Sequence, residues 1–297
     1  MLPYITLIRP LNAFMSSVAV LIGGLLVAGN NPLLLSSPYP LILAMVAVFL
    51  ITGAGNAIND CFDVDSDSVN KPGRPIPAGR VTRRKALAFS VAVFVLGILL
   101  TFLINWACIL IAVVNSVLLV VYSYSLQDRI LLGNVVIGYL VGSTFLFGGA
   151  AFGNLLLPGL LMLLAGLSTV SREIVKDLED IEGDRKSFLK KLTAGVKMKL
   201  SRFVGKEAAA LALNKGRATK AAGTFMFLAI VISPLPYLLN TLSFAYLVIL
   251  APADLIFLSS MLMLARGDGR KKFSRISRTI KAGMLLALIA FIFGVLF

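Results

Sequence analysis

The chain alternates long apolar stretches with short charged segments. Residues 10–59, 86–127 and 130–171 contain no Asp, Glu, Lys or Arg, and residues 221–265 contain only Asp254. Each stretch is about twice the ~20 apolar residues that one membrane-spanning helix requires, and Asn, Gly or Pro residues near its midpoint favour a turn. Each stretch therefore predicts two helices that cross a membrane in opposite directions, and the apolar end of the chain predicts one more.

The pattern predicts an all-α fold, a polytopic membrane protein whose nine transmembrane helices form one domain over residues 1–297. The predicted helices cover residues 11–29, 39–59, 84–103, 106–124, 132–152, 156–177, 219–239, 243–264 and 279–297. Composition agrees with this class, because 58% of the residues are hydrophobic, mean hydropathy is +0.93 and only 14% are charged. A soluble domain has about 25% charged residues.

The basic residues predict the orientation. The net charge is +14, and the Lys and Arg residues fall in the N-terminal segment, in the connections that follow the second, fourth, sixth and eighth helices, or at the helix ends beside them. Cytoplasmic loops are enriched in Lys and Arg, so the N-terminus is expected in the cytoplasm and the C-terminus outside the cell membrane. This distribution explains the basic charge without a nucleic-acid partner.

The acidic residues gather in two short clusters. Ten of the 14 acids lie there: Asp60, Asp63, Asp65 and Asp67 in the first, and Glu173, Asp177, Glu179, Asp180, Glu182 and Asp184 in the second. The first cluster follows the second predicted helix and the second ends the sixth, so both are expected at the cytoplasmic face. A separation of four helices suggests two similar four-helix halves followed by a ninth helix.

The spacing within each cluster indicates a metal site. Asp60, Asp63 and Asp67 are separated by three and four residues, which places them on one face of a helix, and Asp177, Asp180 and Asp184 repeat the spacing. Neighbouring carboxylates repel one another unless a cation lies between them, and Mg²⁺ binds a few carboxylates together with substrate phosphates. We therefore expect each trio to hold one Mg²⁺. The alternative is a solvated acidic helix end, and Asp184 could instead cap the helix from the following loop.

Several cations accompany the acids at the same face. They are Lys71, Arg74, Arg129, Arg172 and Lys176. Metal ions with Arg and Lys clamp polyphosphates, and because the chain lacks a Gly-rich phosphate loop before a helix, a lipid diphosphate fits better than a nucleotide. A divalent-cation transporter is the alternative outside enzymes, but transporters place their acids near the bilayer midplane, where only Asp254 is expected.

The chain has no histidine and two cysteines, Cys61 and Cys108. Imidazole chemistry is therefore excluded, and a disulfide framework is not indicated. Any proton acceptor must be a carboxylate, the phenol of Tyr122 or the departing diphosphate. Asn12, Asn56 and Asn59 lie near the cytoplasmic ends of the first two predicted helices, where polar groups face the interior of a bundle. Arg9 lies beside them. Its side chain could face the bundle interior with Asn12, or it could instead extend toward the membrane surface.

At these residues the chain resembles the UbiA superfamily of intramembrane prenyltransferases. The resemblance lies in NDCFDVDSD (59–67), NKPGRPIPAG (70–79), VYSYSLQDR (121–129) and KDLEDIEGD (176–184). It implies a UbiA-type helical bundle, Mg²⁺ as cofactor and a prenyl diphosphate as substrate. It also implies catalytic roles for Asp60, Asp63, Asp177 and Tyr122, and substrate binding by the three asparagines and five cations named above.

The short chain and the segment REIVKDLEDIEGDRK (172–186) resemble the members of the superfamily that build archaeal ether lipids. This implies transfer of a geranylgeranyl group from geranylgeranyl diphosphate to the hydroxyl of geranylgeranylglyceryl phosphate, a lipid-like phosphorylated acceptor. An aromatic acceptor, either a quinone precursor or a haem, is the alternative within the superfamily. No obligate protein partner is indicated.

Residues 187–208 depart from the superfamily pattern as a basic insertion in the loop between the sixth and seventh predicted helices. Leu189, Leu192, Val196, Leu200 and Phe203 share one helical face, and lysines and arginines occupy the rest. This pattern is typical of an amphipathic helix that lies on anionic lipid, and the alternative is a solvated loop. We expect it to help admit or hold phosphorylated substrates.

Overall fold

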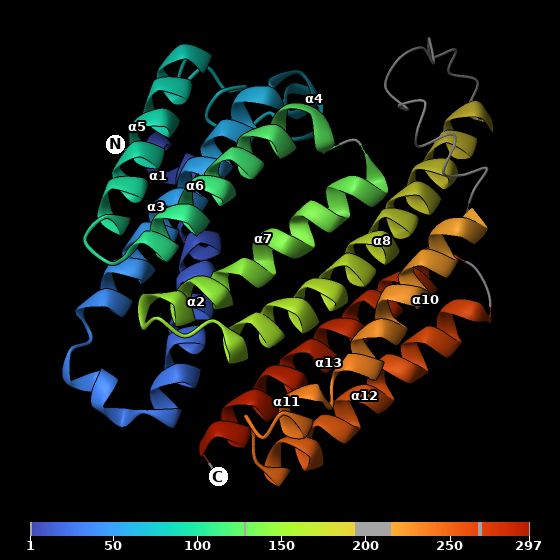
Figure 1. The fold of residues 1–297 in the computed structure, drawn as a ribbon. Coiled ribbons are helices and arrows are strands. Elements are labelled where there is room, and N and C mark those ends of the chain that lie inside the picture. Colours follow the sequence, from blue (N-terminus) through green and yellow to red (C-terminus); the bar gives the residue numbers. More distant parts are fainter. Residues whose placement is uncertain (1, 128, 194–214, 267–268, 297) are drawn as a thin grey trace. The chain divides into compact units, whose positions relative to one another are not determined.

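Helices form all the regular secondary structure of the computed structural model, which describes residues 2–127, 129–193, 215–266 and 269–296 (Figure 1). Nine of the described helices are long and apolar enough to cross a membrane, and they begin with Pro10–Gly29 and end with Lys271–Leu296. The predicted all-α class and the predicted number of spans are therefore confirmed over the described residues.

The first half of the chain contains α1 (Leu2–Ile8), α2 (Pro10–Asn30), α3 (Tyr39–Phe62), α4 (Val64–Asn70), α5 (Arg83–Thr101), α6 (Trp106–Val121), a π-helical turn (Tyr122–Leu126) and α7 (Ile130–Ala151). The second half contains α8 (Leu156–Thr193), α10 (Lys215–Ile232), α11 (Leu235–Leu238), α12 (Phe244–Ala265) and α13 (Arg270–Leu296). Polar side chains cap the N-termini of two of these helices, α5 and α6. Thr82 accepts from the backbone N–H of Lys85 at α5, and Asn105 accepts from that of Cys108 at α6, as polar N-caps do.

Two helices are longer than the apolar pattern predicts. α8 continues past the expected end at residue 177 to Thr193, and α13 starts at Arg270, nine residues before the expected start. Charged residues extend a helix into water as readily as apolar ones extend it through lipid, because Glu, Lys and Arg are good helix formers. A count of apolar residues therefore finds the part of a helix that lies in the membrane and misses the part beyond it.

The chain divides into two compact units, and the division passes through α7 and α8. One unit comprises Met1–Gln127 with Tyr139–Leu163, and the other comprises Asp128–Gly138 with Leu164–Phe297. The sequence suggests a boundary after the fourth transmembrane helix instead. The difference has a physical cause within the first unit: the hairpin where α7 ends and α8 begins is packed on α2 and bonded to Asn105, whose side-chain amide donates to the carbonyl of Ala150 at 2.8 Å.

The first unit is built around α3, which is packed against α1, α2, α5 and α6. Its buried face is lined mostly with small residues, among them Ala44, Ala47 and Ala54. Small side chains allow helices to approach closely, which is how membrane helices gain packing energy where lipid is as apolar as they are. The buried hydroxyl of Ser90 on α5 donates to the carbonyl of Ala54 at 2.8 Å and fixes the two helices together.

The second unit joins the C-terminal part of α8 to α10, α12 and α13. Its core contains Ile174 and Leu178 from α8, Met226 from α10, and Ile280 from α13. Ser171 on α8 donates to the carbonyl of Ala222 on α10 at 2.9 Å. The acidic cluster of α8 is therefore anchored by apolar residues that alternate with its acids and by a buried hydrogen bond just before it.

Asp254 on α12 lies in this unit and has a partner that its sequence context did not indicate. Ser233, just beyond α10, donates to its carboxylate at 2.8 Å, and the hydroxyl of Tyr246 donates to the carbonyl of Ser233. A membrane-embedded acid costs free energy unless a polar group faces it. These contacts connect the end of α10 to α12.

The α2–α7 contact of the first unit generates a stability prediction. A Cβ on Gly148 would overlap the carbonyl oxygen of Val20, whereas a Cβ on Gly159 would meet only the Leu146 side chain at 3.9 Å. Gly148→Ala should therefore destabilise the protein by about 1–3 kcal/mol through overpacking. Thermal unfolding in detergent measures this, with Gly159→Ala as the matched control. Equal melting temperatures for the two variants would contradict the contact.

Candidate active site

The first acidic cluster lies where α3 passes into α4. Asp63 occupies the junction, yet the helical hydrogen bonds continue across it: its N–H donates to Asn59 at 2.9 Å and its carbonyl accepts from Asp67 at 2.7 Å. Asp60 and Asp67, one on each side of the junction, keep the relative placement of residues seven apart on a helix. The bend leaves Asp63 half-buried and both other carboxylates buried.

Arg74 joins the two buried carboxylates. Its Nη1 lies 3.0 Å from Oδ1 of Asp60 and is also paired with Oδ2 of Asp67. Arg9 forms a second ion pair with Asp60. The side chains of Asp60 and Asp67 are only 4% and 6% exposed, so two carboxylates taken out of water are compensated by two guanidinium groups, as buried charges must be.

A compact loop presents Arg74 to these carboxylates. The segment NKPGRPIPAGR winds back on itself, because the carbonyl of Arg74 accepts from Ala78 and the carbonyl of Pro75 accepts from Arg80. Ile76 is buried in a small apolar cluster with Cys61 and Ala86. The prolines restrict the backbone and the buried isoleucine anchors it, so the guanidinium group is held in place by the loop that follows α4.

Three features bring Arg9 to Asp60. Leu7 is fully buried and fixes α1, Asn56 of α3 donates to the carbonyl of Ile8 at 2.9 Å, and Arg9 itself has a left-handed backbone with φ of 52°. Such a conformation is costly for a residue with a side chain and is found preferentially at functional sites. The alternative in which Arg9 merely reaches toward the membrane surface is therefore wrong, because its guanidinium group is bound to Asp60.

Asp63 binds an amide rather than an arginine. Gln127 donates to its carboxylate at 3.0 Å and accepts from the side-chain amide of Asn59 at 2.7 Å. The π-helical turn Tyr122–Leu126, closed by a bond from the N–H of Gln127 to the carbonyl of Tyr122, precedes Gln127. Burial raises the pKa of Asp63 above its usual range, and the bond from Gln127 only partly offsets this. A nearby cation would favour its ionised form.

The remaining predicted residues of the first unit lie around this network. Lys71 ends α4 and is exposed, Asn12 is exposed on the first turn of α2, and Tyr122 is half-buried at the start of the π-helical turn. The side-chain amide of Asn56 donates to the carbonyl of Ile8 and so supports the α1–α2 corner. Arg129, an exposed residue, belongs to the second unit.

In the second acidic cluster, Asp177 on α8 is the first of the three predicted metal ligands. Asn134 on α7, itself buried, donates to its carboxylate at 2.7 Å. Gly138 lies one turn further along α7, where a Cβ would overlap the carbonyl oxygen of Gly166. This close approach of α7 and α8 in the second unit is what lets the short Asn134 side chain reach Asp177.

The two cations of this cluster share one acid. Glu173 is paired with Arg172 and lies 3.9 Å from Nζ of Lys176. Nε of Arg172 is buried and has no hydrogen-bond partner among the described residues. An unpaired buried donor is costly, and an anion that reached this side chain would satisfy it. This supports the predicted substrate-binding role of Arg172.

Asp180 and Asp184 follow on α8. Asp180 is exposed, and Asp184 lies inside the helix rather than in a loop, because α8 runs to Thr193. A capping role for Asp184 is therefore wrong. Its side chain, and the predicted amphipathic insertion at 187–208, lie outside the residues whose side chains are described.

Four residues of these networks were not predicted as site residues: Arg9, Gln127, Asn134 and Glu173. Gln127 lies two residues before the predicted substrate-binding residue Arg129, in the segment VYSYSLQDR. Asn134 is an amide within a predicted span, which is itself a signal of a buried polar contact. Glu173 precedes Lys176 by three residues, a spacing typical of helical ion pairs. Asn134 and Glu173 could therefore have been found from the sequence.

The donors of both clusters suit a hard divalent cation, because they are carboxylate oxygens. Within the described part of the chain, however, no three acidic or cysteine side chains converge on one point. In the first cluster the positive charge of Arg74 lies between Asp60 and Asp67, which shows that this position accepts a cation. We conclude that the first cluster fits a metal if Arg74 gives up at least one carboxylate.

The fold and these acidic networks define an intramembrane prenyltransferase: the chain belongs to the UbiA prenyltransferase family, whose sequence model matches residues 16–295. A digeranylgeranylglyceryl phosphate synthase from Methanococcoides burtonii is 41% identical over 299 residues, covering 98% of this chain and 99% of that protein. A solved structure of digeranylgeranylglyceryl phosphate synthase in membranes has 34% identity and a TM-score of 0.83, covering 99% of this chain and 98% of that one.

A more distant structure shares the fold. A UbiA homologue from Archaeoglobus fulgidus, solved with GPP and Mg²⁺, has 16% identity and a TM-score of 0.65, and the match covers 97% of this chain and 99% of that one. Family membership makes this chain a multi-pass membrane enzyme, and the transporter alternative is not supported.

The ion pairs of the first cluster generate a prediction about the protein without metal. Arg74→Gln leaves Asp67 buried without its arginine, which should lower the free energy of unfolding by on the order of 3 kcal/mol. Thermal unfolding in detergent with a chelator present measures the loss. Arg84→Gln removes a charge from an exposed residue and should leave the melting temperature unchanged. A similar melting temperature for both variants would show that the pairs do not form.

Proposed function

We propose that the chain transfers a geranylgeranyl group from geranylgeranyl diphosphate to the hydroxyl of geranylgeranylglyceryl phosphate, forming an archaeal ether-lipid precursor. The observation that carries this proposal is the 41% identity, over nearly the full length of both proteins, with the synthase from Methanococcoides burtonii. The described carboxylate and arginine networks support it, because they offer both signs of charge that a metal diphosphate needs.

Mg²⁺ is the proposed cofactor, as in the Archaeoglobus fulgidus homologue solved with GPP and Mg²⁺. Asp60, Asp63 and Asp67 would hold one ion, and Asp177, Asp180 and Asp184 another. When bound, Mg²⁺ supplies positive charge that makes diphosphate a better leaving group.

Arg74 has a direct part in this proposal. Its guanidinium fork suits carboxylate and phosphate equally well, so we propose that it leaves Asp67 for the diphosphate when the substrate binds. Arg9, paired with Asp60, is placed to do the same. Arg74 and Arg9 thus neutralise the carboxylates when no substrate is bound and the diphosphate when substrate is bound.

The reaction breaks the bond between C1 of the prenyl group and the diphosphate oxygen and forms a bond from C1 to the acceptor hydroxyl oxygen. Charge develops on the departing diphosphate, and fixed positive groups stabilise it; Lys71, Arg129, Arg172 and Lys176 are the further candidates. The hydroxyl proton passes to a carboxylate, to Tyr122 or to the released diphosphate. Asn59, held by Gln127, supports Asp63 in this arrangement.

The active site is proposed at the cytoplasmic face, with the N-terminus on that side and the C-terminus outside. Cytoplasmic loops are the basic ones, and all basic residues lie in the segments assigned to that side or at the helix ends beside them.

A product assay tests the proposal. The purified chain with Mg²⁺ and labelled geranylgeranyl diphosphate is offered geranylgeranylglyceryl phosphate, a quinone precursor or haem, and products are identified by mass spectrometry. We expect an ether of the glyceryl phosphate with one diphosphate released per ether. A product formed only with an aromatic acceptor would overturn the proposed acceptor.

Matched variants separate catalysis from general damage. Asp177→Asn should reduce turnover by about 100-fold or more, because it weakens the proposed site of a metal ion that stabilises the developing charge, and losing one such stabilising group typically costs that much. Asp65 lies in the first cluster but is exposed, so Asp65→Asn should keep near-normal turnover. Equal activity of the two variants would contradict the site.

A further inference from the structure

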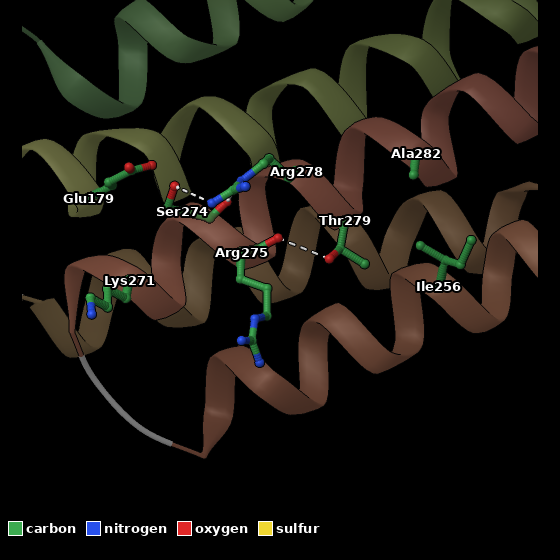
Figure 2. A pocket seen from close by; sticks show the side chains of 8 residues that line it. All are labelled: Glu179, Ile256, Lys271, Ser274, Arg275, Arg278, Thr279 and Ala282. Carbon is green, nitrogen blue, oxygen red and sulfur yellow. Dashed lines mark hydrogen bonds between the residues drawn. The ribbon is translucent and has the colours of Figure 1, made fainter.

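A pocket in the second unit is lined by none of the residues that form the two hydrogen-bonded acidic networks, although Glu179 of the second acidic cluster contributes to its wall. It has a volume of about 950 Å³ and is formed by α8, α12 and α13 (Figure 2). Cavities of roughly 300–1,000 Å³ hold small ligands. The activity proposed above does not yet use this pocket, although one wall of it belongs to the helix that bears the second acidic cluster.

Three cations line the pocket at its polar end. Lys271, Arg275 and Arg278 all project from the first turns of α13, and all three are exposed. Arg278 donates only weakly to Ser274, at 3.4 Å to both its carbonyl and its hydroxyl, and Figure 2 shows Arg275 extending in a different direction. Among the residues that the structure describes, no carboxylate forms an ion pair with any of the three.

The pocket becomes apolar along the helix. Ile256 of α12 and Ala282 of α13 line its other end, and Ala282 lies about 16 Å along α13 from Lys271 at 1.5 Å per residue. The candidate membrane span Lys271–Leu296 begins with these cations. Lys and Arg side chains near the end of such a span reach toward the lipid headgroups, so the apolar end of the pocket is expected deeper in the bilayer. Basic pockets of this kind between transmembrane helices bind lipid headgroups.

Glu179 restricts the ligand further. It lines the pocket from α8 and is the one acid there, so it repels a second anionic group. A ligand with a phosphate toward the arginines and a neutral hydroxyl toward Glu179 satisfies both signs of charge. A glyceryl phosphate with an apolar chain has these three parts.

We propose that this pocket binds the phosphate of the lipid acceptor through Arg275 and Arg278, with Lys271 at its rim. The assignment of the ligand as the acceptor rests on the proposed function. The α8 wall places the pocket beside the helix that carries Asp177, so the acceptor's headgroup is held next to an acidic cluster of the reaction. Arg275 and Arg278 are then specificity residues for a phosphorylated acceptor.

Binding of geranylgeranylglyceryl phosphate to the full-length chain in nanodiscs of neutral lipid, without donor or metal, tests this proposal. Arg275→Gln combined with Arg278→Gln should raise the dissociation constant roughly tenfold or more, since each removes a charge-assisted hydrogen bond. Lys272→Gln combined with Lys281→Gln removes the same charge from α13 outside the pocket and should leave the constant unchanged. In turnover assays, the double variant of Arg275 and Arg278 (the pocket variant) should have a higher KM for the acceptor than the wild type and the same KM for the prenyl diphosphate.

Competitors distinguish the possible sources of phosphate. Phosphatidylglycerol, whose phosphate is a diester with a single charge, and inorganic phosphate, which has no apolar chain, should at matched concentrations displace the acceptor less effectively than unlabelled acceptor does. Equal displacement by either would overturn the proposal, as would an unchanged dissociation constant in the pocket variant or no binding to the wild type. If the wild type binds the acceptor through these arginines but forms no ether, the proposed function fails and the pocket stands. If it forms the ether and the pocket variant binds normally, the pocket fails alone.

Discussion

The pairing of Arg74 with Asp60 and Asp67 is the interaction on which the site of the first unit depends. Two carboxylates are buried where α3 passes into α4, and carboxylates removed from water must be compensated by charge. The chain meets this requirement with a loop that is anchored by a buried isoleucine and with a strained Arg9 backbone. The same requirement makes the position suitable for a metal ion, because it already holds positive charge.

Each conspicuous local feature near the cluster serves this charge balance. The bend at Asp63 turns one carboxylate toward Gln127 while the other two face Arg74. The π-helical turn before Gln127 is a rare conformation that occurs often at functional sites. In the second unit, the close approach of Gly138 and Gly166 lets Asn134 reach Asp177. Close packing of small residues thus positions polar groups that the membrane would otherwise disfavour.

The sequence predicted the all-α class, the number of spans and the family, because charge-free stretches and acidic motifs are local patterns. It did not predict the extension of α8 to Thr193 or the early start of α13, since charged helical turns leave no apolar signature. The partners of the acids were missed for a different reason. Arg9 and Asp60 are 51 residues apart, and Asn59 and Gln127 are 68 apart, so only the folded chain brings them together.

Counting bound metal tests the central claim most directly. Electron paramagnetic resonance of Mn²⁺, with an unreactive prenyl diphosphate analogue present, reports how many ions each chain holds. The account predicts that Asp67→Asn lowers the count by one ion relative to the wild type, and that Asp65→Asn, which changes an exposed acid, leaves it unaltered. An unchanged count for Asp67→Asn would contradict the claim that the carboxylates paired with Arg74 are the ones that receive the metal.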